Sequence, residues 1–211
     1  MTAVRTRRRY AVAALTVVAV VLTACTPIKT GSAAIAGADT LRENDLSTLA
    51  SEITALASEK EVELPDPSQL NQRIIAVWVD ERLTTALADE LEVTATQANV
   101  DDLLAQFSDE QLTQIAVGSG IAPSALQEAA RAAVLRQAIS QSVAADAKTQ
   151  DEQLAALSKA YLDTAKKLGV SINPRYATWN ASTAQVEPRV DGLSQLAEPV
   201  VAPETTLPSG G

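Results

Sequence analysis

The sequence has no histidine, a single cysteine, and aromatic residues at only 3% of its positions. Without histidine, Ser-His-Asp and Cys-His catalysis and the HExxH zinc motif are excluded. One cysteine cannot form a disulfide within the chain, so the stability of the fold must come from packing. The chain also lacks a GxxxxGK[ST] loop and a GxGxxG fingerprint. We therefore expect no cofactor and no small-molecule substrate.

Carboxylates are the abundant chemical groups, with 26 Asp and Glu residues. They fall on predicted polar helix faces, where solvation explains them. The pairs Asp101-Asp102 and Asp109-Glu110 lie near predicted helix starts, where negative charge complements the helix dipole. We expect neither catalytic residues nor a metal site, and thus no enzyme. The carboxylates leave one enzymatic alternative open, a two-carboxylate cell-wall hydrolase.

The first 24 residues have the layout of a signal peptide. Four arginines among residues 5–9 form a basic block, and an apolar run follows over residues 10–22. This run is shorter than the roughly 20 residues that a membrane-spanning helix needs. We therefore predict a cleaved export signal over residues 1–24. The general export route fits the apolar run better than the twin-arginine route.

Leu22-Thr23-Ala24-Cys25 resembles the lipobox of bacterial lipoproteins: an aliphatic residue, two small residues, then the cysteine that is acylated. Cys25, the only cysteine, stands where the motif requires one. The resemblance implies cleavage before Cys25, a diacylglycerol group with palmitate-type chains on its thiol, and a tether over residues 25–32. The protein would then be anchored on the extracytoplasmic face of the cell membrane. The alternative is an ordinary secreted protein with a chance cysteine.

The mature chain would be strongly acidic. Without residues 1–24, 13 of the 17 basic residues remain against 26 acidic ones, a net charge of −13. Such a surface attracts neither nucleic acid nor anionic headgroups. Lipid must therefore hold the protein at the membrane, and two acyl chains suffice where one anchors only marginally.

Residues 33–180 have the periodicity of a mainly α, multi-helix domain. Apolar residues recur at spacings of three and four, and capping signals punctuate them. A capping box is also predicted over residues 40–43. We expect helices around residues 46–56, over 68–91, from Thr96 to near 107, from Ser108 to near 117, from Pro123 to near 147, and from Thr149 to 168.

A minor two-stranded β pairing is expected between residues 33–36 and 170–173, burying Ile35 and Ile172 together. Residues 181–211 are predicted to be a disordered, acidic, Pro-rich tail, since such a composition cannot offset its ordering entropy by burial. Trp78, Tyr176 and Trp179 are the candidate apolar residues, either as binding anchors or as parts of the core.

Several segments are similar, in order, to the N-terminal domain of SurA-like extracytoplasmic chaperones. Residues 33–41 resemble that domain's A-x-V-N-G-x-x-I/L opening, with Ala36 in place of Asn. Residues 77–83 and 91–100 look like its long helix and the link that follows it. Residues 172–180 are similar to an N-P-R-Y-G-x-W-D ending of actinobacterial lipoproteins of this type. The resemblance covers about residues 33–180.

One departure limits what the resemblance implies. SurA-like proteins commonly carry a parvulin prolyl-isomerase domain before the final helix, but only about ten residues separate Val143 from Leu154, and a domain needs at least roughly 50. The resemblance therefore implies a membrane-anchored holdase for unfolded exported polypeptides, without isomerase activity. The alternative is a non-catalytic accessory or structural lipoprotein in cell-envelope assembly.

Overall fold

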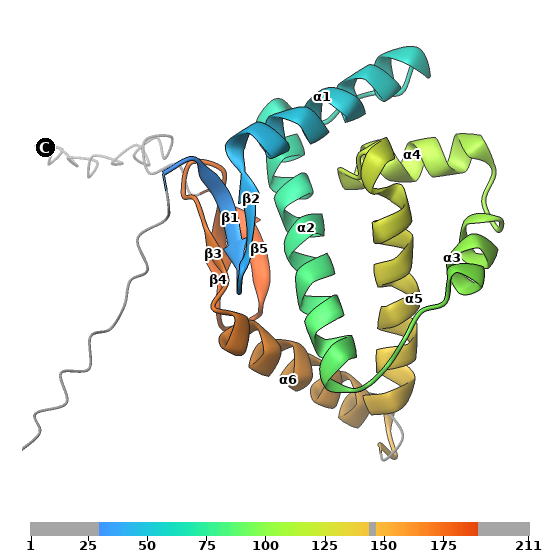
Figure 1. The fold of residues 1–211 in the computed structure, drawn as a ribbon, viewed down its shortest axis with the longest axis vertical. Helices are drawn as coiled ribbons and strands as arrows, with labels where there is room; N and C mark the ends of the chain where they lie inside the picture. The colour runs from blue at the N-terminus through green and yellow to red at the C-terminus, as the bar shows by residue number, and fades with distance from the viewer. Residues whose placement is uncertain (1–29, 144–146, 190–211) are drawn as a thin grey trace, which may run out of the picture.

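The computed structural model describes residues 30–143 and 147–189, and within them the fold is mainly helical, as predicted (Figure 1). The predicted signal over residues 1–24, Cys25 and residues 190–211 of the predicted tail lie outside the described residues. The helices are α1 (Glu43–Glu59), α2 (Pro67–Glu90), α3 (Gln97–Leu104), α4 (Asp109–Ser119), the short 3-10 helix η1 (Pro123–Ala125), α5 (Leu126–Val143) and α6 (Gln150–Leu168).

Local capping interactions explain where most helices begin and end. At the start of α4, the Gln111 N–H donates to Ser108 Oγ at 3.2 Å, and the Ser108 N–H donates to Gln111 Oε1 at 2.9 Å. Thr96 and Thr149 accept in the same way at the starts of α3 and α6. Gly169 ends α6 with a left-handed φ of 62°. The sequence predicts these ends correctly because the contacts are local.

Several helix ends differ from the prediction. The third helix ends at Leu104 rather than near residue 107. The second helix begins at Pro67 rather than Ser68, because proline fits the first turn of a helix, where its missing N–H costs nothing. The described part of the fifth helix runs to Val143, and Ala147, to which helix was expected to extend, is not helical.

The predicted pairing of the two ends of the domain is confirmed, as part of a larger sheet. Strand β1 (Ser32–Ala36) pairs antiparallel with both β2 (Asp39–Arg42) and β3 (Ser171–Ile172), in the order β2-β1-β3. The capping box expected over residues 40–43 is wrong, because this segment forms β2 and the start of α1. Instead, the Arg42 N–H donates to Asp45 Oδ2 at 3.3 Å as α1 begins.

The expected joint burial of Ile35 and Ile172 is wrong. Ile172 is buried and stands opposite Ala34, whereas Ile35 is half-buried and stands opposite Ser171. Side chains alternate along a strand and directly paired residues share a face, so the two isoleucines point to opposite faces of the sheet.

The fold also extends beyond the predicted start of the tail at residue 181. Strand β4 (Ala177–Asn180) forms an antiparallel hairpin with β5 (Gln185–Pro188). Asn180 Oδ1 accepts the Ser182 N–H at 2.9 Å, an Asx turn that favours the reversal. Trp179 pairs with Val186, and both pack against the core. Two apolar contacts with the folded domain thus order a segment whose composition alone predicts disorder.

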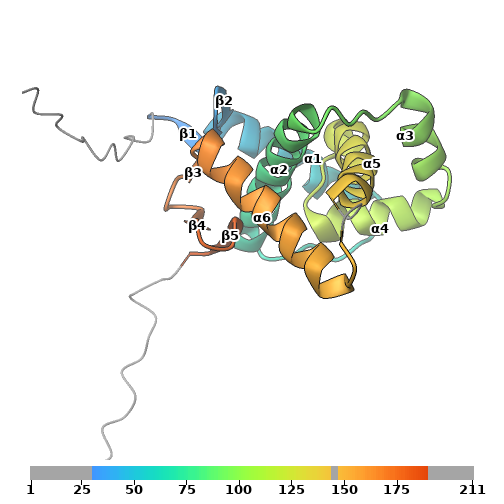
Figure 2. The same cartoon turned by 90° about the horizontal axis from the view of Figure 1, so that it is seen from below.

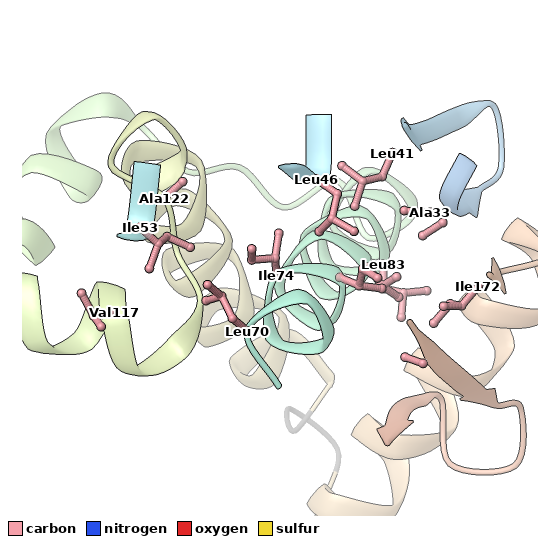
Figure 3. Packing of buried hydrophobic residues seen from close by; sticks show 14 of the residues in the cluster. Ala33, Leu41, Leu46, Ile53, Leu70, Ile74, Leu83, Val117, Ala122 and Ile172 are labelled. Carbon is pink, nitrogen blue, oxygen red and sulfur yellow. The ribbon is translucent and has the colours of Figure 1, made fainter. Parts of the chain in front are cut away.

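Helix α2 is central: it runs between the two sheets and α5, with α1 across one end and α6 across the other (Figures 1 and 2). Its eight buried residues lie on a wide face, as predicted. In Figure 3, Ile53, Leu70 and Val117 meet near one end of the core, while Ala33 and Ile172 pack toward the other. A second cluster joins α2 to α5 through Leu87, Ala88, Leu135 and Ile139.

Candidate functional site

A largely apolar cavity lies between α2, α3, α4 and α5, and we call it the α2–α5 hollow. It has a volume of about 350 Å³. Helices α3 and α4 lie on the side of α5 away from the sheets, as Figures 1 and 2 show. The residues that line the α2–α5 hollow are Val77, Asp80, Glu81, Leu103, Leu104, Phe107, Leu112, Ile115, Ser119, Ile121, Leu126, Ala129, Ala130, Ala133 and Arg136.

Two large apolar side chains of the hollow are open to solvent. Phe107, the only phenylalanine of the chain, is 37% exposed, and Ile115 is 40% exposed. Phe107 follows the end of α3, and its N–H donates to Leu104 O at 3.2 Å. Core packing does not account for this exposure. Grouped exposed apolar residues beside a concave surface are typical of a binding site.

Polar contacts hold the walls of the hollow in place. Arg131 of α5 donates to Ala95 O at 3.1 Å and to Gln97 Oε1 at 3.0 Å, which ties the start of α3 to α5. On the other side, Arg73 of α2 donates to the carbonyl of Gly118, near the end of α4. Helices as short as α3 and α4 are marginal alone, so these contacts and the packing define the shape of the hollow.

Three charged residues line an otherwise apolar surface. Arg136 Nη1 and Asp80 Oδ2 form an ion pair at 2.9 Å between α5 and α2. Glu81 has a buried Oε1 atom, and this atom has no hydrogen-bond partner among the described residues. Asp80 and Arg136 also line a second hollow of about 470 Å³, beside Tyr161 and Trp179.

Burial raises the pKa of Glu81 to about 7. The negative charges of Glu128 and Asp80 add to this rise, while Arg82 and Arg136 oppose it. Burial likewise raises the pKa of Asp80, and its ion pair with Arg136 opposes that rise. Glu81 therefore changes charge near neutral pH, at the surface of the hollow.

We expect Glu81→Gln to stabilise the fold at pH 8 but not at pH 5. The unfolded Glu has a pKa of about 4.3, so the native protein binds more protons than the unfolded chain between this value and about 7. The contribution of Glu81 to the free energy of unfolding therefore falls as the pH rises from about 4.3 to about 7. Glutamine mimics the neutral acid at every pH. Allowing for partial contact with water, we expect a gain of roughly 1–2 kcal/mol at pH 8.

Urea denaturation of both proteins at pH 5 and pH 8 measures this difference. Glu59→Gln serves as the matched control, because the Glu59 side chain is 69% exposed, does not line the hollow, and is not among the charges that shift the pKa of Glu81. It should retain the pH dependence of the parent. A Glu81→Gln variant whose stability relative to the parent were the same at both pH values would contradict the assignment.

The three aromatic candidates predicted from the sequence lie elsewhere. Trp78, Tyr176 and Trp179 are half-buried, pack against the main core cluster, and do not line the α2–α5 hollow. The Arg82 guanidinium carbon lies 5.6 Å from the centre of the Trp78 ring. Tyr176 contributes to a more polar groove of about 740 Å³ along α1. The structure thus does not bring the three into one site.

The sequence patterns do not single out Glu81, Phe107 or Ile115 as site residues. One signal was available: Asp80-Glu81-Arg82 places consecutive charges within the wide apolar face of α2. A charged residue in such a face is partly buried and its pKa is shifted, which often marks a functional site. Nothing local identifies Phe107 or Ile115, because each fits the ordinary apolar stripe of a short helix.

In residues 30–143 and 147–189, no group of three or more His, Cys, Asp or Glu residues could hold a metal ion. No helix in the same ranges is long and apolar enough to cross a membrane.

Comparison of the chain with protein-family models, with curated proteins and with solved structures finds no match. The function must therefore be argued from the site itself.

Proposed function

We propose that this protein is a lipid-anchored extracytoplasmic holdase, which binds apolar segments of unfolded exported polypeptides in the α2–α5 hollow. The supporting observation is the hollow itself, with Phe107 and Ile115 exposed at an apolar surface. Burial of apolar area is non-directional and tolerates many sequences, as a holdase requires. A hollow of about 350 Å³ accommodates one or two side chains of a bound segment.

The order of elements supports a SurA-like N-terminal module without an isomerase domain. A hairpin, β1 and β2, precedes the long central helix, and β3 returns to β1 after the final helix. Only residues 144–149 separate α5 from α6. This is far below the roughly 50 residues of a domain. The proposed activity is therefore binding alone, without catalysis.

A lipid anchor on Cys25 would keep the domain close to the membrane. Seven residue steps lead from Cys25 to Ser32, where β1 begins. A fully extended chain of this length spans no more than about 25 Å. The hollow would thus be held near the surface where exported chains emerge unfolded.

Ile115→Asp should abolish most of the holdase activity. The charge disfavours burial of an apolar segment, while the 40% exposure of Ile115 lets the fold tolerate it. We expect suppression of client aggregation, followed by light scattering, to require at least roughly fivefold more of the variant, which corresponds to the loss of about one buried aliphatic contact. Leu154→Asp is the matched control, because Leu154 is 54% exposed and lies on α6, outside the hollow. Failure of the parent to slow aggregation at molar excess would refute the proposal.

Cys25→Ser should release the protein from the membrane without unfolding residues 33–180. Serine has no thiol to carry the thioether-linked diacylglycerol group, and the acidic surface has no attraction of its own for anionic headgroups. Cell fractionation tests the location, and urea denaturation of the released form tests the fold. Thr26→Ser is the matched control and should stay membrane-bound. A Cys25→Ser protein that stayed fully in the membrane fraction would rule out the anchor.

One observation favours the second candidate, a non-catalytic accessory lipoprotein of envelope assembly. The hollow contains a defined ion pair, Arg136–Asp80, and the Glu81 Oε1 atom, for which the described part of the chain supplies no hydrogen-bond partner. Such fixed polar groups give specificity for one partner. Mild-detergent capture of the anchored protein separates the two: an accessory subunit co-purifies with one defined protein in constant ratio, whereas a holdase brings down a mixture that competes with an unfolded client.

A further inference from the structure

We propose that the segment bound in the α2–α5 hollow carries a basic residue beside its apolar side chain, and that this basic group pairs with Glu81. The inference rests on the proposed function, since it names the class of polypeptide segment that this same hollow takes. The inference follows from which of the charged residues that line the hollow have an oppositely charged partner.

Two of the three charged lining residues neutralise each other. Arg136 and Asp80 are paired at 2.9 Å, with side chains 46% and 40% exposed. Arg136 is thus already engaged, and an acidic ligand would have to displace a carboxylate to reach it. This leaves Glu81 as the charge of the hollow that no close partner in residues 30–143 and 147–189 compensates.

The nearest cation in sequence, Arg82, contacts residues outside the hollow. Its Nη1 lies 3.7 Å from Asp39 Oδ2, and its guanidinium lies over the Trp78 ring. Neither Asp39 nor Trp78 lines the hollow. Arg82 attracts Glu81 at a distance, but Glu81 Oε1 still has no hydrogen-bond donor among the described residues.

A buried acceptor without a donor is costly, and a ligand that supplies the donor gains by relieving that cost. An ammonium or guanidinium group forms a charge-assisted hydrogen bond, which is stronger than one from a neutral amide. An acidic group would instead meet the like charges of Glu81, Asp80 and the neighbouring Glu128. The net charge, −13 without residues 1–24, also attracts cationic segments at long range. The hollow therefore favours apolar side chains that neighbour lysine or arginine.

Three synthetic peptides test this, each with the same central leucine and phenylalanine, flanked by lysine, glutamine or glutamate. Fluorescence anisotropy at pH 8 and low salt measures their dissociation constants. We expect the lysine peptide to bind about tenfold more tightly than the glutamate peptide. Glu81→Gln should remove most of this preference, because it keeps the shape and loses the charge. Glu59→Gln, outside the hollow and not among the charges that act on Glu81, should retain it.

A change of pH gives an independent readout on the parent protein. Protonation of Glu81, with its pKa of about 7, should shrink the preference for lysine at pH 6. The other charges around Glu81 are Asp80, Arg82, Glu128 and Arg136. Of these, Asp80 also has a raised pKa, so Glu81→Gln is measured at both pH values and should show no comparable change.

The outcomes separate this inference from the function on which it rests. If the three peptides bind equally and Ile115→Asp weakens all of them, the hollow binds apolar segments, but the charge preference is refuted. If the glutamate peptide binds most tightly, or Glu81→Gln leaves the preference intact, the inference is likewise overturned. If no peptide binds while the protein is folded by circular dichroism, the proposed function itself fails.

Discussion

Gly120→Ala should lower the free energy of unfolding by about 3 kcal/mol or more. Gly120 ends α4 with a φ of +77°, a conformation that costs an L residue about 1–2 kcal/mol. A Cβ at this position would lie 2.7 Å from Arg73 Cβ and 3.0 Å from the Ile74 nitrogen of α2. The two atoms are the Cβ of a side chain and a backbone nitrogen. Neither changes position with the rotamer, so no rotamer change relieves the clash. The end of α4 must therefore move away from α2.

The other glycines near helix ends provide graded controls. Gly169 also has a positive φ, +62°, but its Cβ would meet nothing within 4 Å. Gly169→Ala should therefore cost only the conformational part, about 1 kcal/mol. Gly118 lies inside α4 with open space around it, and alanine there should be neutral or stabilise by up to about 1 kcal/mol. Urea denaturation ranks the three variants. Similar losses for Gly120→Ala and Gly169→Ala would show that the α2–α4 contact is not tight.

The same change should damage the binding site. Ile115 and Ser119 of α4 line the α2–α5 hollow, and displacement of the end of α4 moves that wall. Gly120→Ala protein that stays folded at low temperature should thus also bind client segments less tightly. Gly120 therefore affects both stability and binding, because it sets how closely the end of α4 packs against α2.

Ile75→Ala should lower the free energy of unfolding by about 3–4 kcal/mol. Ile75 is 0% exposed in the middle of α2 and belongs to the main core cluster. Truncation removes three carbons and leaves a cavity that the surrounding helices and sheet fill only in part. A domain of this size is stable by about 5–15 kcal/mol, so the loss is a large share of the total.

Ile115→Ala makes the same chemical change at a residue that is 40% exposed. It should cost less than about 1 kcal/mol, because little apolar area returns to water and no enclosed cavity forms. Thermal or urea unfolding of the two variants, compared with the parent, measures the contrast. Equal losses at both positions would show that the core is not centred on α2.

Sequence patterns predicted the helices well and the β structure less well. The capping box at Ser108 and the terminal glycine at Gly169 act over three or four residues, so their effect is legible in the chain. The pairing of β1 with β3 was predicted from apolar segments at the two ends of the domain. Strand β2 and the β4–β5 hairpin were missed, since short strands are stabilised by what they pack against rather than by composition.

The candidate site was predictable only in outline. An apolar surface for polypeptides followed from a family resemblance, whereas the aromatic residues singled out for it pack on the core instead. The sequence indicates Glu81 only weakly, as a charged residue within the apolar face of α2. The near-neutral pKa of Glu81 depends on burial by neighbouring elements and on charges of α2 and α5. Residues of α2 and α5 are far apart in the sequence and become neighbours only in the fold.

Local sequence alone accounts for which segments are helical, for most helix ends, and for the prediction of a lipid anchor at Cys25. Each depends on side chains within a few residues of one another. The tertiary fold alone decides that Ile35 and Ile172 face opposite ways and that Glu81, Phe107 and Ile115 share one hollow. The physical reason is that strand register, burial and charge environment are set by contacts between residues that are far apart along the chain.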